Sequence, residues 1–394
     1  MNVSLQSKIT LYPLSIQKDN KHYIVEEPIS GDFFELPEIS VDAIKRKEKG
    51  EELAAIETVL KDAYPAEDVN ILEFVEQLVE LGLVQAVDGV PVKRGQEKQA
   101  KSASAGFLWI PYWVGRLFFN KTMNVFYLLL LVVNIFILIV NPQLFPHYKD
   151  LFLFDSMVLN MISYLLISIV LILIHEFGHV LAIRSYDLPA KLSIGNRLIF
   201  IVFETDLTQA WKLNPKQRKI LYLAGMSFEQ IILFLSFGFM LLFPDANFVG
   251  ILGIVVLDLF IKFIYQCCFY MKTDVYYVIE NVTGCYNLME NGQTYLSSFL
   301  KKHRKSGKNH KEMFQDEWNL IRMYSVFYIV GVFLTLLLAV LYFVPQLYYM
   351  FTTIYLNLLG VGNRAAFWDA MAFFVMMMIM LILLVYLARK KEVK

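Results

Sequence analysis

Six long apolar runs constrain the fold of this chain more than any other feature of its sequence. Hydropathy places them at about residues 123–141, 156–184, 220–243, 247–271, 321–344 and 367–388. Each run is long enough for a helical crossing, which needs about 20 residues. The 394-residue chain is 57% hydrophobic and only 18% charged, unlike an ordinary soluble domain. The sequence therefore predicts a multi-pass α-helical membrane protein of about six transmembrane helices.

The second run contains a His-Glu-x-x-His motif, formed by His175, Glu176 and His179. On a helix, residues four apart share one face, so the two imidazoles can bind one metal ion. Ionisable side chains are costly inside a bilayer and need a functional reason. We predict that His175 and His179 bind Zn2+ and that Glu176 is the general base toward water. The alternatives are a chance match and a transporter's proton relay.

A catalytic zinc site usually has three protein ligands and a water, so one more ligand is needed. The other histidines belong to the soluble domain, an outer loop and a basic loop, and are poor candidates: His22, His147, His303 and His310. His175 lies about 27 Å along its span from Met157, near the cytoplasmic end. Asp274 follows the fourth span at a matching depth and is the predicted third ligand. Asp258, about half a span nearer the outer side, is its competitor.

Basic residues gather on alternate connections between the spans. They are concentrated in 182–219, in 299–312 and in the tail from residue 389, whereas 142–155, 244–246 and 345–366 hold only Lys149 and Arg364. By the positive-inside rule, the basic segments and both termini face the cytoplasm, and the predicted location is the cell membrane. The formal net charge is zero, which gives no support to a nucleic-acid partner.

Residues 1–90 differ from the rest and predict a small soluble α+β domain. Period-two patterns predict strands at Ile9–Ile16, His22–Val25 and Phe33–Leu36, and helical spacing predicts helices at Val41–Lys47, Leu53–Ala63 and Val69–Leu81. A polar linker at 91–106 and an aromatic interfacial segment at 107–122 follow. The membrane domain then occupies 123–394, with its core at 156–277.

The N-terminal domain resembles the PqqD-like domain, a winged-helix-like module that binds leader peptides in ribosomal peptide maturation. The resemblance is carried by Gly31–Leu36, Lys49-Gly50-Glu51, Tyr64 and Glu73–Val84. It implies that a peptide is bound by adding a strand to an exposed sheet edge. The alternative is a folded cap that binds no ligand.

The membrane core is similar to the site-2 protease family of intramembrane zinc metalloproteases. The resemblance implies that His175, His179 and Asp274 bind the zinc and that Glu176 is the general base. The chain departs from the family pattern in three places. These are Val275 directly after Asp274, Cys268-Phe269-Tyr270 before it, and Met226 in the second core helix. The resemblance also implies that Leu198–Thr205 belongs to a hairpin at the membrane edge that aligns substrate as an added strand. A purely structural hairpin is the alternative.

Together the two resemblances imply a zinc endopeptidase of the ribosomal peptide maturation branch, near epipeptide-type gene clusters. The expected substrate is a ribosomally made precursor peptide, modified or not, cut at the cytoplasmic side of the membrane. The expected partners are this precursor, the lipid bilayer, and a modifying enzyme and an exporter from the same pathway. The alternatives are cleavage of a membrane-anchored regulator and a non-catalytic transporter or immunity protein.

Overall fold

The chain forms two compact units in a computed structural model that describes residues 3–19, 22–65, 67–92, 106–197, 200–285, 287–300 and 318–392. The first unit contains residues 1–106 and 208–218, and the second contains residues 107–207 and 219–394. Most of the predicted linker at 91–106 and most of the basic loop at 299–312 lie outside the described residues.

The first unit is a small α+β fold. Its strands are β1 (Ile9–Leu11), β2 (Ser15–Asp19), β3 (His22–Glu27), β4 (Asp32–Leu36), β5 (Val84–Val87) and β6 (Val90–Pro91). Its helices are α1 (Glu38–Glu48), α2 (Leu53–Ala63) and α3 (Ile71–Glu80). Antiparallel pairing gives two three-stranded sheets, with the orders β2-β3-β4 and β1-β5-β6. The three predicted helices are confirmed, with ends that shift by a few residues.

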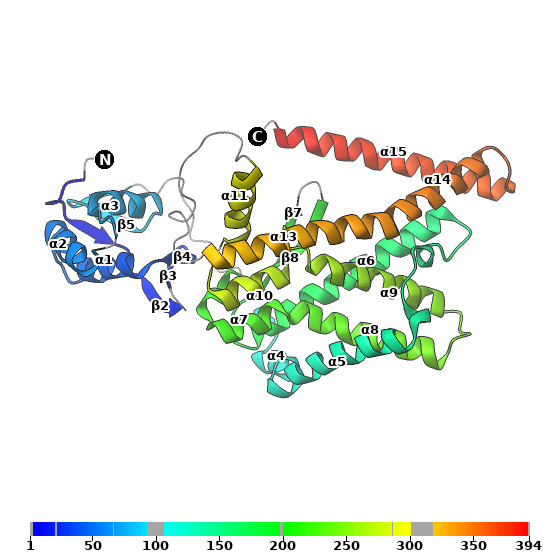
Figure 1. Cartoon of the computed structure of the whole chain (residues 1–394), viewed down its shortest axis with the longest axis horizontal. Coiled ribbons are helices and arrows are strands. Elements are labelled where there is room, and N and C mark those ends of the chain that lie inside the picture. The colour runs from blue at the N-terminus through cyan, green and yellow to red at the C-terminus, as the bar shows by residue number, and fades with distance from the viewer. Residues whose placement is uncertain are drawn as a thin grey trace. The chain divides into compact units, whose positions relative to one another are not determined.

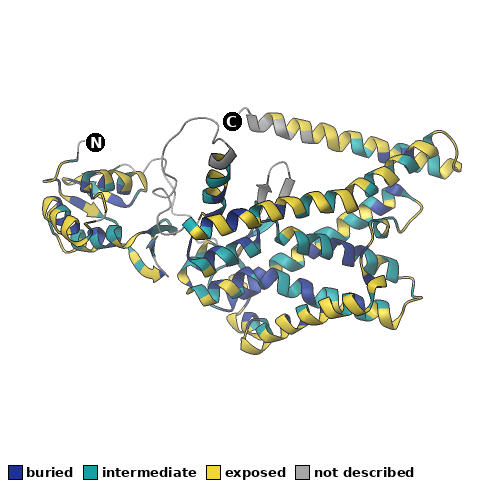
Figure 2. Ribbon diagram, viewed as in Figure 1, coloured by how far each residue is buried: buried dark blue, intermediate teal, exposed yellow. Residues whose placement is uncertain are grey.

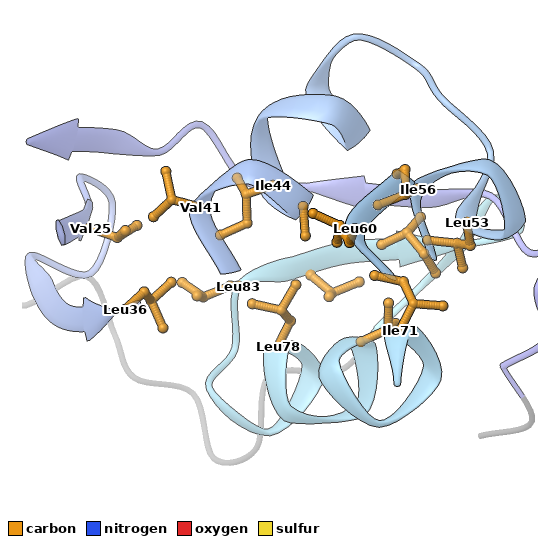
Figure 3. Close-up of a cluster of buried hydrophobic side chains, with 14 of the residues drawn as sticks. Val25, Leu36, Val41, Ile44, Leu53, Ile56, Leu60, Ile71, Leu78 and Leu83 are labelled. Carbon is orange, nitrogen blue, oxygen red and sulfur yellow. The ribbon is translucent and has the colours of Figure 1, made fainter. Parts of the chain in front are cut away.

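One apolar core holds this unit together. Each helix contributes residues at helical spacing, such as Ile56 and Leu60 from α2, and these belong to the same buried cluster as Val25 of β3 (Figure 3). Ile56 and Val25 are fully buried. Burial of a whole aliphatic side chain stabilises a fold by about 1.5–3 kcal/mol, so this cluster gives the unit a core of its own.

The predicted strand at Ile9–Ile16 is wrong as a single element. The structure divides it into β1, which pairs with β5, and β2, which pairs with β3 in the other sheet. Pro13 lies at the break, and a proline has no N–H to donate to a neighbouring strand. The preceding Tyr12 still donates its N–H to the Leu83 carbonyl, which ends the β1 pairing. Strands β5 and β6 were not predicted.

A segment distant in sequence completes the first unit. The short helix η4 (Thr208–Lys212) lies against β4, and Lys212 forms an ion pair with Glu26 of β3 at 2.8 Å. Arg218 pairs with Asp19, and these side chains are only 1% and 3% exposed. Because removing one partner of a buried ion pair leaves an uncompensated charge, this pair fixes the segment on the unit.

Where the structure describes it, the second unit is helical apart from one hairpin. Its longer helices are α4 (Tyr112–Phe118), α5 (Lys121–Val140), α6 (Met157–Arg184), α8 (Ala224–Leu242), α9 (Val249–Gln266), α10 (Asp274–Thr283), α11 (Leu288–Leu300), α13 (Trp318–Leu338), α14 (Val344–Leu358) and α15 (Arg364–Glu392). Short helical turns are η1 (Gly106–Trp109), η2 (Pro142–Leu144), η3 (Tyr148–Leu151) and η5 (Ala339–Phe343). The hairpin consists of β7 (Lys191–Arg197) and β8 (Phe200–Asp206), and helix α7 (Pro215–Tyr222) crosses the boundary between the units.

Six helices in the described residues are long and apolar enough to cross a membrane, which makes this a multi-pass membrane protein. Helices α5, α6, α8 and α9 run alongside one another in Figure 1, and α8 contacts each of the other three. Figure 2 shows that α5 and α15 are mostly exposed, and their exposed side chains are apolar, for example Phe136 and Ile382. An exposed apolar surface of this size suits hydrocarbon as its solvent.

Two predicted span boundaries are wrong. The fourth span ends at Gln266 instead of residue 271, because the Thr273 hydroxyl turns back and donates to the Gln266 carbonyl at 3.0 Å. The fifth continues through the π-helical turn η5 to Leu358, so most of the predicted outer connection at 345–366 is helical. A π turn accommodates Pro345, which lacks the N–H of an ordinary helical residue.

Candidate metal centre

Helix α6 carries the His-Glu-x-x-His motif near its C-terminal end. The helix has no internal proline, begins at a Ser156 N-cap that accepts the Leu159 N–H, and ends before Asp187, which has a positive φ of 59°. Its last residues, from Gly178 to Arg184, are buried, whereas much of its first half is exposed. The motif therefore lies where α6 enters the protein interior.

Each motif histidine is fixed through its Nδ1 atom. His179 Nδ1 lies 2.9 Å from the Leu221 carbonyl oxygen, and His175 Nδ1 lies 3.0 Å from Glu229 Oε1 on α8. A carbonyl or a carboxylate oxygen only accepts, so both Nδ1 atoms carry the proton. In the neutral imidazoles this leaves both Nε2 atoms with a free lone pair, which is the form that binds a metal.

The two Nε2 atoms converge on Asp274. They lie 3.2 Å from each other, and Asp274 Oδ2 lies 3.0 Å from His175 Nε2 and 3.5 Å from His179 Nε2. Their side chains are 13%, 3% and 19% exposed for His175, His179 and Asp274. The structure thus brings together the three residues that the sequence predicted as ligands, from α6 and from the start of α10.

Asp274 is positioned by residues on both sides of the turn that follows α9. Gln266 Nε2 donates to Asp274 Oδ2, and the Asp274 N–H donates to Gln266 Oε1, both at 3.1 Å. Thr273 caps α10, so Asp274 lies in a first helical turn, where a negative charge is favoured. Burial raises the pKa of the Asp274 carboxyl, but His179 and His175 outweigh burial and lower it when they are protonated, because their charge and their hydrogen bonds favour the anion.

Two glycines allow α6 and α8 to approach closely beside the site. A Cβ on Gly178 would lie 2.7 Å from the Ala224 carbonyl oxygen, and a Cβ on Gly225 would overlap the His175 ring. Small residues at a crossing let two membrane helices come into backbone contact. This contact lets Glu229, one turn further along α8, reach the Nδ1 atom of His175.

The donor set fits Zn2+. Zinc binds imidazole nitrogen and carboxylate oxygen at about 2.0–2.2 Å in tetrahedral geometry, which places ligand atoms about 3.3 Å apart. The three donor–donor distances of 3.0, 3.2 and 3.5 Å are close to that spacing. Three protein ligands leave a fourth position for water or substrate, as in catalytic zinc sites.

Glu176 follows His175 directly on α6, and its side chain reaches strand β8. Its Oε2 accepts two hydrogen bonds from Thr205 of β8, one from the backbone N–H and one from the hydroxyl, each 2.8 Å long. Thr205 ends the apolar run for which the sequence predicted a hairpin, and that hairpin is confirmed by the antiparallel pairing of β7 with β8.

The competitor Asp258 is not part of the group. It is 2% exposed, and its Oδ2 lies 2.6 Å from Lys262 Nζ, one turn along the same helix. A carboxylate buried among apolar helices needs such a counter-charge. Asp258 therefore has a structural partner of its own.

Three supporting residues were missed by sequence reasoning: Glu229, Gln266 and Thr205. Glu229 had a usable signal, because it is a carboxylate within an apolar span. Gln266 and Thr205 had none, because an amide and a hydroxyl near a span end are common and their roles depend on tertiary contact.

Comparison of the chain with protein-family models, with curated proteins and with solved structures finds no match.

Replacing Asp274 with alanine should remove one of three ligands and lower the zinc content of the purified protein severalfold or more. The matched variant Asp258→Ala removes a carboxylate from the neighbouring helix without touching the group, and should keep its zinc. Metal content measured by mass spectrometry checks both variants. The opposite pattern would make Asp258 the ligand.

Replacing Gly225 with alanine should push the His175 ring from its place and lower zinc affinity by about tenfold or more. Gly238→Ala is the matched control on α8, because a Cβ there meets nothing within 4 Å. Competition with a chelator of known affinity measures the zinc affinity of both variants. Equal affinities would show that the α6–α8 contact does not position His175.

Proposed function

We propose that the protein is a Zn2+-dependent intramembrane endopeptidase of the site-2 protease type. The observation that carries the proposal is the convergence of His175 Nε2, His179 Nε2 and Asp274 Oδ2, next to a glutamate that follows His175 directly. The same arrangement of two imidazoles, one carboxylate and an adjacent glutamate suits activation of water for hydrolysis.

Zinc bound there would supply Lewis-acid activation of a water and of the peptide carbonyl. The residues of the chain do the rest. Glu176 takes the proton of the attacking water as it adds to the carbonyl carbon, and passes it to the amide nitrogen as the C–N bond breaks. Glu229 and the Leu221 carbonyl hold the imidazoles in the tautomer that leaves Nε2 free.

The hairpin supports a peptide substrate in extended form. A helical peptide bond is shielded by its own hydrogen bonds, so hydrolysis requires that the substrate be unwound. Strand β8 contacts α6, and Thr205 lies directly against the motif glutamate. An extended chain beside β8 would lie next to the site.

For the substrate, we propose a ribosomally made precursor peptide that is cut at the cytoplasmic side during its maturation. The charge asymmetry of the connections supports cytoplasmic termini in the cell membrane. Among the described residues, β2 pairs only with β3, so the part of its other edge before Asp19 has no partner strand and could accept a peptide strand. That edge supports the PqqD-like interpretation of the first unit.

Glu176→Gln tests the proposed chemistry, because glutamine keeps the shape of the side chain but cannot accept the proton. The variant should retain zinc and lose cleavage of a precursor peptide by at least about a hundredfold. Peptide products are measured by mass spectrometry after incubation with protein in detergent. Turnover equal to wild type would refute the general-base role, and a wild-type protein without zinc would favour the transporter interpretation.

Deleting residues 1–90 tests the substrate class. If the first unit binds the leader, cleavage of the full precursor should fall about tenfold or more, while cleavage of a short core peptide should change little. The cleavage rates of the full precursor and of the core peptide are measured for the deletion variant and for wild type. An equal loss for both would assign the first unit a structural role and favour a membrane-anchored regulator as substrate.

A further inference from the structure

We infer that Thr205 is the positioning residue for the general base, which deepens the proposed function and rests on it. Thr205 and Glu176 come from separate elements, β8 and α6, and are brought together only by the fold. Thr205 is 9% exposed, so its contact with the glutamate is shielded from solvent.

The contact with Thr205 holds one oxygen of the Glu176 carboxylate and leaves the other oxygen available to accept a proton. Glu176 Oε2 accepts both the N–H and the hydroxyl of Thr205, each at 2.8 Å. The same hydroxyl oxygen lies 3.2 Å from the Glu176 carbonyl oxygen, but one hydroxyl proton can serve only one acceptor, and Oε2 is nearer. Within the described residues, Glu176 Oε1 has no hydrogen-bond partner, so it is the oxygen that can take a proton from water.

Two donors on one oxygen also restrict rotation of the side chain. A glutamate has three rotatable bonds, and a single donor would still allow the carboxylate to swing. The Thr205 N–H belongs to a strand held in register by its pairing with β7, where Thr205 faces Leu192. The fixed position of the strand therefore limits the movement of the Glu176 carboxylate.

The surroundings make this restraint necessary. Glu176 borders a cavity of about 350 Å3 whose seven other lining residues are apolar, among them Phe107, Leu173 and Phe177. Water in such a cavity has few polar groups to orient it. Among the described residues, only the backbone N–H at position 205 would hold the carboxylate if the Thr205 hydroxyl were removed.

Thr205→Val tests the inference, because valine has the shape of threonine but no hydroxyl. We expect kcat to fall about tenfold to a hundredfold with KM and zinc content unchanged, since the base is misplaced but the substrate and metal ligands are not. Thr205→Ser keeps the hydroxyl and should restore most of the rate. Ser193→Ala is the matched control, because it removes a hydroxyl from β7 that donates to the Glu204 carbonyl and not to Glu176.

A second measurement is independent of turnover. Acetohydroxamic acid binds a zinc centre and donates a hydrogen bond to the adjacent carboxylate. Calorimetry on the zinc-loaded full chain should show binding about tenfold weaker for Thr205→Val than for wild type, with Thr205→Ser and Ser193→Ala near wild type. A Thr205→Val protein that matches wild type in kcat and in hydroxamate affinity would overturn the role of Thr205 alone. A wild-type protein that binds no zinc would refute the metal centre and this role together.

Discussion

The hydrogen bond between His175 and Glu229 is the contact on which the site depends most. It lies among apolar helices, where an unpaired polar atom costs several kcal/mol. The bond satisfies the Nδ1 proton and directs Nε2 toward His179 and Asp274. The same requirement explains other polar pairs in the second unit. Asn134 of α5 donates to the Gln230 carbonyl and side chain at 3.0 and 2.9 Å, and Asp258 pairs with Lys262. Each of these side chains has at least one partner within the helices.

Helix packing provides that partner at the right place. Gly178 and Gly225 let α6 and α8 meet at backbone distance, and this contact brings the Glu229 carboxylate behind the His175 ring. Helix α7 ends just before this crossing, and its Leu221 carbonyl accepts a hydrogen bond from His179 Nδ1. The α6–α8 crossing therefore orients His175, and the end of α7 orients His179. Gln266 positions Asp274 separately.

Much of this arrangement could be predicted from the sequence because its signals are local. The six spans follow from apolar length, and the imidazole pair follows from helical spacing. Asp274 could be predicted from depth along two spans, because helical rise converts residue number into distance. The parts that were missed depend on tertiary contact. Nothing local distinguishes Thr205 or Gln266 from other polar residues near span ends, and the division of Ile9–Ile16 depends on which sheet each half joins.

Zinc K-edge X-ray absorption of the protein, purified without chelators, tests whether His175, His179 and Asp274 bind zinc. We expect about one zinc per chain, with imidazole nitrogen and carboxylate oxygen at about 2.0–2.2 Å and no sulfur neighbour. A protein without zinc would contradict this expectation. So would a zinc with a sulfur neighbour at about 2.3 Å, because cysteine is not among the three residues that converge here.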